Sequence, residues 1–341
     1  MSYLTERERY QIEILLKERY TPKQIAERLH RHKTTIYREI KRGSVFMLDT
    51  NLKSYAKYCP DVAQNKYHIN KLNKGSDLKI GNDIELANYI ERKIIYEKYS
   101  PQAVLYTIKT HGLKFRTSIC FKTIYNYIDK GIFFHLNSSH LPLRKSRRKR
   151  SARPRICLRN VSRRSIEERP VHTLKRAYFG HWEMDTVYSG HGVKDCLLVL
   201  SERKTRHEII LQMPDRTAQS TVNVLNSLER IYKERFSDIF QTITVDNGVE
   251  FSDSEGMEAS VLYPGSRRTA IYYCHLYASY ERGTNENING MIRRFIPKGA
   301  DIGVYTKEQV QKIEDWINNY PRKLFGGLSS NQYCQSLGLL L

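Results

Sequence analysis

The chain is 341 residues long, and its 57 Lys and Arg against 36 Asp and Glu give it a formal net charge of +21. A hydrophobic share of 40% and an aromatic share of 11% allow folded cores and exclude a wholly disordered chain. The length predicts two or three domains, and the basic balance indicates a polyanionic partner, either nucleic acid or an anionic membrane surface. The sequence contains no signal peptide after Met1 and no apolar run of about 18 residues or more, so we expect a cytoplasmic protein with no membrane partner.

The cysteines argue against two further classes of protein. Six of them are scattered along the chain, and no two form a C-x-x-C pair. The pattern therefore favours neither a structural zinc site nor a disulfide framework, and we interpret the cysteines as reduced residues that mostly pack in cores.

The first forty or so residues predict three short helices. Thr5 with Glu8 and Thr21 with Gln24 form two capping boxes, and a third helix begins near Lys33 after a short polar turn. This pattern is typical of a helix-turn-helix, whose third helix enters the major groove of DNA. The side chains expected to face DNA are Lys33, Thr34, Tyr37 and Arg38. A small helical bundle for protein contacts is the alternative, but the basic side chains lie where a recognition helix needs them.

A weak internal repeat predicts a second helix-turn-helix. The sequences YTPKQ at 20–24 and TIYREI at 35–40 recur as YSPQA at 99–103 and TIYNYI at 123–128. Coincidence within a short motif is the alternative. Two such units on one chain would recognise a longer, bipartite DNA site. The DNA-contacting residues expected in the second unit include Lys122 and Thr123.

The composition changes abruptly between 137 and 165, where eleven Lys or Arg and no acidic residue occur. Such a run cannot order itself by burial, so we expect a flexible or extended arm that follows DNA phosphates. A nuclear-localisation signal is the rival interpretation of the motif, but nothing else in the sequence favours it. The arm residues expected to contact DNA include Arg147, Arg148, Lys149 and Arg150.

From about residue 166 the pattern switches to strands that alternate with helices. The expected strands are 179–190, 195–205, 207–214, 242–248 and 269–276. The expected helices are 218–236, the segment around Glu286, and a last helix from Thr306 through Trp316. This order predicts an α/β domain around a mixed sheet.

Three acidic residues occupy unusual positions in this domain. Asp185 lies inside an otherwise hydrophobic strand, Asp246 ends an apolar run, and Glu286 lies on the polar side of an amphipathic helix. A buried carboxylate without compensation costs several kcal/mol. For one such acid a salt bridge to Arg would suffice, but three acids on three elements favour a hard divalent cation such as Mg²⁺. Two metal ions held by shared carboxylates catalyse in-line displacement at phosphorus without a protein nucleophile.

These motifs resemble the IS-thirty family of bacterial insertion-sequence transposases, which belong to the DDE transposase and retroviral-integrase superfamily. The resemblance covers nearly the whole chain. It rests on the tandem helix-turn-helix units and on three segments: RRSIEERP followed by GHWEMD within 163–185, TVDNGVEF at 244–251, and ERGTNENINGMIRRFIPKGAD at 281–301.

The resemblance implies an RNase H-like catalytic domain in which Asp185, Asp246 and Glu286 bind two Mg²⁺ ions, with Mn²⁺ as a substitute. It also implies cleavage at the terminal inverted repeats of the element, attack of a 3′-hydroxyl on target DNA, and a homodimer or larger homo-oligomer on paired DNA ends. One departure concerns the third acid, because 39 residues separate Asp246 from Glu286, more than is usual for the family. Glu281, after 34 residues, is the competitor, but Gly283 disfavours a helix there.

Other polar residues near these motifs have two interpretations each. Glu183 shares a strand face with Asp185, so it either supports the metal site or forms a structural ion pair. Asn287, Asn289 and Arg293 either position a DNA phosphate or hold Glu286, or else act as caps and surface residues. We also expect a phosphate contact from Lys298.

The sequence as a whole predicts a multidomain, metal-dependent DNA transposase. Two alternatives stay open: a DNA-binding regulator with an inactive catalytic domain, and a nuclease that hydrolyses without joining. The expected domains are a first helix-turn-helix at 1–50, a connector at 51–87, a second helix-turn-helix at 88–136, a basic linker at 137–165 and the catalytic domain at 166–341.

Overall fold

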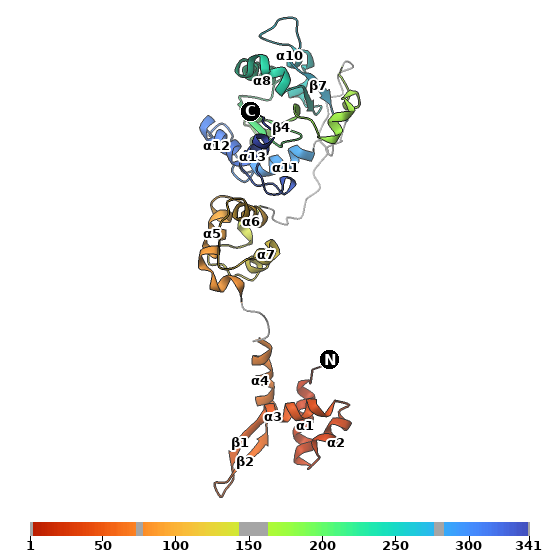
Figure 1. The fold of residues 1–341 in the computed structure, drawn as a ribbon, viewed down its shortest axis with the longest axis vertical. Helices are drawn as coiled ribbons and strands as arrows, with labels where there is room; N and C mark the ends of the chain where they lie inside the picture. The colour runs from red at the N-terminus through yellow and green to blue at the C-terminus, as the bar shows by residue number, and fades with distance from the viewer. Residues whose placement is uncertain (1–2, 73–77, 143–162, 276–282, 340–341) are drawn as a thin grey trace. The chain divides into compact units, whose positions relative to one another are not determined.

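A computed structural model describes residues 3–72, 78–142, 163–275 and 283–339 (Figure 1). The chain forms two compact units, Met1–Gly81 and Asn82–Leu341. Five residues singled out from the sequence lie outside the described residues: Arg147, Arg148, Lys149, Arg150 and Glu281.

The first unit begins with three short helices, as the sequence predicts. They are α1 (Glu6–Lys17), α2 (Pro22–Arg28) and α3 (Lys33–Gly43). Both predicted capping boxes form, because each threonine side chain accepts the backbone N–H three residues later and the Glu or Gln there accepts the threonine N–H. Ile12, Ile25 and Ile36 are fully buried and place one residue from each helix in a common core.

The predicted connector is partly a folded extension of this unit. An antiparallel hairpin of β1 (Ser44–Leu48) and β2 (Ser54–Tyr58) leads into α4 (Pro60–Leu72). Tyr58 and Ala63 join the core of the three helices. A buried ion pair also crosses this unit: Arg9 Nε lies 2.6 Å from Glu39 Oε1, and Arg9 Nη1 donates to Gln64 Oε1 on α4 at 2.6 Å.

The second unit also begins with three helices, α5 (Ile84–Ile95), α6 (Pro101–Thr110) and α7 (Phe121–Asp129). Asp83 caps α5 by accepting the backbone N–H of Leu86 at 3.0 Å, and its other oxygen accepts the backbone N–H of Thr117 at 2.9 Å. This buried carboxylate therefore ties the start of α5 to the segment before α7.

A mixed five-stranded sheet follows, in agreement with the sequence prediction. Its strands are β3 (His181–Tyr188), β4 (Cys196–Glu202), β5 (Glu208–Met213), β6 (Thr242–Val245) and β7 (Ala270–Tyr273). The spatial order is β5-β4-β3-β6-β7, in which β4 is antiparallel to both β3 and β5, while β6 runs parallel to both β3 and β7. Strand β3 is therefore central.

Helices cover both faces of this sheet (Figure 1). They are α8 (Ala218–Tyr232), α9 (Phe236–Ile239), α10 (Ser254–Glu258), α11 (Gly283–Ile292), α12 (Lys307–Asn318) and α13 (Ser330–Ser336). On one face Trp182 packs with Leu225 and Phe240. On the other face Val187 packs with Ile288 of α11 and Ile317 of α12. Among the described residues, no helix has the length and apolar character needed to cross a membrane.

Candidate active site

The exposed side of α3 carries all four residues that the sequence assigns to DNA contact. Their side chains are exposed, while Ile36 and Glu39 on the opposite side are buried. The four are Lys33, Thr34, Tyr37 and Arg38. The residues that the sequence assigns to DNA contact in the second unit lie at the start of α7: Lys122 is exposed, and the hydroxyl of Thr123 lies 3.3 Å from Cys120 Sγ.

Two of the predicted catalytic acids lie on neighbouring elements of the sheet. Asp185 is in β3, and Asp246 directly follows β6. The parallel register pairs Glu183 with Thr244, so Asp185 and Asp246, each two residues beyond this pair, occupy level positions along the two segments. Alternation along β3 places Asp185 on the same face as Val187, which is the face that α11 and α12 cover.

Helix α11 lies over this face. Ile288 and Ile292 are fully buried, and Asn289 Nδ2 donates a hydrogen bond of 2.9 Å to Asp185 Oδ2. Glu286 lies one turn before Asn289, and its side chain is exposed. No three His, Cys, Asp or Glu side chains in the described parts of the chain lie close enough to hold a metal ion. Helix α11 therefore contacts Asp185 through Asn289 in this structure.

The remaining acid of the strand, Glu183, forms a buried ion pair. Its side chain is fully buried, and Oε1 lies 2.8 Å from Arg203 Nη1 and 3.9 Å from Arg176 Nη2. Although Glu183 shares the face of Asp185, two guanidinium groups compensate its charge. The contact matches the structural ion pair that the sequence left open.

Of the other polar residues on and after α11, Arg293 is fixed by hydrogen bonds, whereas Asn287 and Lys298 are exposed. The guanidinium of Arg293 donates to the carbonyl oxygen of Tyr188 at 2.7 Å and to that of Pro297 at 3.3 Å, so it fastens the end of α11 to the end of β3. Asn287 is exposed and faces a cavity beside α11. Lys298 is exposed in the turn that follows.

Glu250 is a residue that the sequence interpretation did not single out. It is almost fully buried and anchors the segment after Asp246: Oε1 accepts from the hydroxyl of Thr186 at 2.6 Å, and Oε2 lies 3.0 Å from Arg216 Nη2. Gly248 fits between the two acids, because a Cβ there would lie 2.6 Å from Glu250 Oε2 and 2.9 Å from Asp246 Oδ1. The signal was present in the motif TVDNGVEF, which places an acid four residues after Asp246.

We expect His181, at the start of β3, to make the stability of the second unit depend on pH. Burial, reinforced by the nearby charges of His172 and Arg203, lowers the pKa of His181 to about 4 from its usual 6.5. The folded state holds the neutral ring, so its stabilising contribution is fully present above pH 6.5. As the pH drops from 6.5 towards 4, only the unfolded chain takes up a proton on this ring, and the free energy of unfolding falls by about 1.4 kcal/mol per pH unit. Urea unfolding at a series of pH values measures this slope.

Replacing His181 with Gln should remove about half of the pH dependence that buried histidines give to this unit. A part of the slope should remain, because burial also lowers the pKa of His207 to about 4. Exchange of His191, which is exposed, for Gln is the matched control. An unchanged slope in His181→Gln would exclude His181 as its source.

Comparisons with known proteins agree with the two-part architecture. A family model described as a helix-turn-helix domain matches residues 1–43. The chain is 30% identical over 342 residues to the transposase for insertion sequence element IS4351 of Bacteroides fragilis. The aligned region covers 97% of this chain and 94% of the relative.

Two further relatives extend this similarity. The identity is 30% to the transposase for element IS1086 of Cupriavidus metallidurans, over 94% of this chain and 90% of the relative. It is 27% to the transposase InsI for element IS30C of Escherichia coli, over 95% of this chain and 81% of the relative. These matches confirm the resemblance seen in the sequence, and the chain belongs to the IS30 family of insertion-sequence transposases, with a helix-turn-helix DNA-binding domain at its N-terminus.

Proposed function

We propose that this chain cleaves DNA at the terminal inverted repeats of an insertion sequence and joins the freed 3′ ends to target DNA. The observation that carries the proposal is the level placement of Asp185, in β3, and Asp246, directly after the adjacent parallel strand β6, together with a helix on the same face that bears Glu286. The central position of β3 and the mixed order of the sheet support an RNase H-like fold for this domain.

The side chains near this site suit a divalent cation. Asp185, Asp246 and Glu286 offer only carboxylate oxygens, the ligands that Mg²⁺ and Mn²⁺ prefer, and these three residues would hold the metal. Two bound ions would activate the attacking oxygen and stabilise the leaving one. The protein's own part is to position these acids: Asn289 holds Asp185 by a hydrogen bond, and Glu250 fixes the segment that carries Asp246.

The helical regions would select the DNA. In our proposal α3 reads the major groove with its exposed basic face, and α5 to α7 form a second helix-turn-helix that reads a second part of the repeat. The arm residues Arg147 to Arg150 and the exposed Lys298 would neutralise phosphates and add affinity without selecting sequence. Cutting two ends of one element calls for at least two protomers on the DNA.

Strand transfer in vitro tests this function. The full chain is incubated with labelled DNA that carries the element's own ends, together with target DNA and Mg²⁺. We expect joined products that disappear when a chelator removes the metal. Cleaved but unjoined DNA would support the nuclease alternative, and binding without cleavage would support the regulator.

A further inference from the structure

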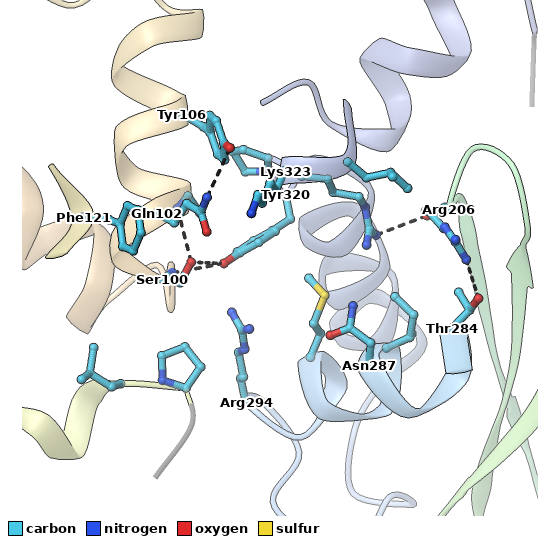
Figure 2. Close-up of a pocket in the computed structure, with 18 of the residues that line it drawn as sticks. Ser100, Gln102, Tyr106, Phe121, Arg206, Thr284, Asn287, Arg294, Tyr320 and Lys323 are labelled. Atoms are coloured by element: carbon cyan, nitrogen blue, oxygen red, sulfur yellow. Dashed lines mark hydrogen bonds between the residues drawn. The ribbon is translucent and has the colours of Figure 1, made fainter. Parts of the chain in front are cut away.

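A cavity lies beside α11 and is lined by residues of this helix other than Asn289, which contacts Asp185. We name it the α6–α11 cavity; its volume is about 700 Å³, within the range of about 300–1,000 Å³ that is typical of ligand sites (Figure 2). Thr284 and Asn287 of α11 line it on one side, and Gln102 and Tyr106 of α6 line it on the other. Because Asn287 directly follows Glu286, the cavity adjoins the helix of the proposed active site.

Positive charge converges on the α6–α11 cavity. Among its described lining residues there is no Asp or Glu, while the cationic ones are Arg176, Arg206, Arg294, Arg322 and Lys323. Figure 2 shows that Arg294, which follows the C-terminal end of α11, projects into the space between α11 and α6. Its Nη1 donates to the carbonyl oxygen of Lys98 at 2.9 Å, but its Nε is buried without a hydrogen-bond partner.

The acids nearest to these cations compensate them only in part. Glu183 Oε1 lies 2.8 Å from Arg203 Nη1, outside the cavity, and 3.9 Å from Nη2 of the cavity residue Arg176. Burial raises the pKa of Glu208 well above its usual value. Burial, together with the charge of neighbouring Arg176, lowers the pKa of Arg206 to about 10. A group of mutually repelling cations of this kind is stabilised by an anion.

Aromatic side chains complete the lining. Phe121 and Tyr125 of α7 are 38% and 36% exposed, so their ring faces are partly open to a ligand. Tyr320 is held in place, since its hydroxyl donates to Ser100 Oγ at 2.9 Å and accepts the backbone N–H of Ser100 at 3.1 Å. Trp316 Nε1 also donates to the carbonyl oxygen of Glu97 at 2.8 Å. These contacts join the start of α6 to the end of α12 and stabilise the shape of the α6–α11 cavity.

Arginine and aromatic rings together match the chemistry of a nucleotide. Guanidinium groups bind phosphate oxygens, and aromatic faces stack on bases. A duplex exposes only base edges in its grooves, so ring faces inside a concave site can stack on a base only after that base has left the duplex. We propose that the α6–α11 cavity binds a short unpaired segment of a DNA strand, with its phosphate on Arg294 and Lys323 and its base on the aromatic side chains of α7. This inference rests on the proposed function, in which DNA ends are the substrate.

A binding experiment without divalent metal tests the α6–α11 cavity separately from catalysis. The full chain is titrated, in the presence of a chelator, with a blunt duplex of the element's end and with the same duplex carrying a short unpaired extension. We expect the native chain to bind the extended DNA about tenfold more tightly. Lys323→Glu should remove most of this preference and leave the affinity for blunt duplex nearly unchanged. Phe121→Ala should lower the affinity for the extended DNA more than the affinity for blunt duplex.

Two substitutions away from the cavity are matched controls. Lys312→Glu reverses the same charge on the exposed side of α12, and Phe134→Ala removes a 91% exposed ring outside the cavity. Both should keep the preference for extended DNA. Equal affinity of the native chain for both DNAs, or an equal loss for both DNAs in the cavity variants, would overturn the inference. If strand transfer fails while the preference persists, the proposed function is wrong and the nucleotide site stands.

Discussion

Replacing Asp246 with Asn should reduce DNA cleavage and joining by about a thousandfold or more and leave DNA binding intact. Asp246 lies level with Asp185 at the centre of the sheet, so the substitution removes a carboxylate from the proposed metal site without changing side-chain size. A metal-bound transition state depends on several kcal/mol of charge stabilisation, and each 1.4 kcal/mol corresponds to about tenfold in rate. Gel assays of cleaved and joined products measure the loss.

The matched control is Asp315→Asn on the exposed side of α12, which should retain full activity. Binding of the element's end, measured with the same preparations, should be equal for all three proteins. Cleavage by Asp246→Asn at a rate near that of the native chain would contradict the assignment of Asp246. The same comparison with Glu286→Gln decides whether α11 supplies the third acid.

Replacing Arg9 with Met should destabilise the first unit by about 3 kcal/mol and weaken sequence-specific DNA binding. The side chains of Arg9 and Glu39 are each 2% exposed, so the substitution leaves a buried carboxylate whose remaining partner, Arg42, is 30% exposed. Breaking a buried ion pair from one side costs about 3–5 kcal/mol, a large fraction of the stability of a small domain. Urea unfolding followed by helical circular dichroism measures the change.

A paired variant separates the loss of charge compensation from the loss of packing. Arg9→Met combined with Glu39→Leu should regain most of the stability, because apolar residues of similar size often replace a buried ion pair without net cost. Arg7→Met, at an exposed position of the same helix, is the control for α1. A single variant as stable as this control would show that the ion pair contributes little.

Local features of the fold could be predicted from the sequence because the interacting residues lie close together in the chain. Thr5 with Glu8 and Thr21 with Gln24 act over three residues, and both capping boxes form. The periodicity around Glu286 placed Ile288 on a buried side and Glu286 on an exposed side, and the structure agrees. The strands of the mixed sheet were also found, since alternation and apolar runs are local signals.

The packing of the connector could not be predicted from local sequence patterns. The sequence prediction separated it from the first helix-turn-helix, whereas the hairpin and α4 pack on that unit through Tyr58 and Ala63. Gly43 allows this packing, because a Cβ at Gly43 would lie 2.4 Å from the ring of Tyr58. The pairing of a glycine with a ring fifteen residues away depends on how the chain turns, which no local pattern specifies.

The sequence by itself determined the family, and it predicted the three candidate acids and the exposed basic side of α3. Only the tertiary structure decided which residues meet: Asn289 reaches Asp185 across 104 residues of chain, and the register of β3 and β6 brings Asp246 level with Asp185. The α6–α11 cavity exists for the same reason, since Ser100 and Tyr320 are 220 residues apart. Strand register and helix packing are set by burial summed over the whole domain, so they cannot be read from any short segment.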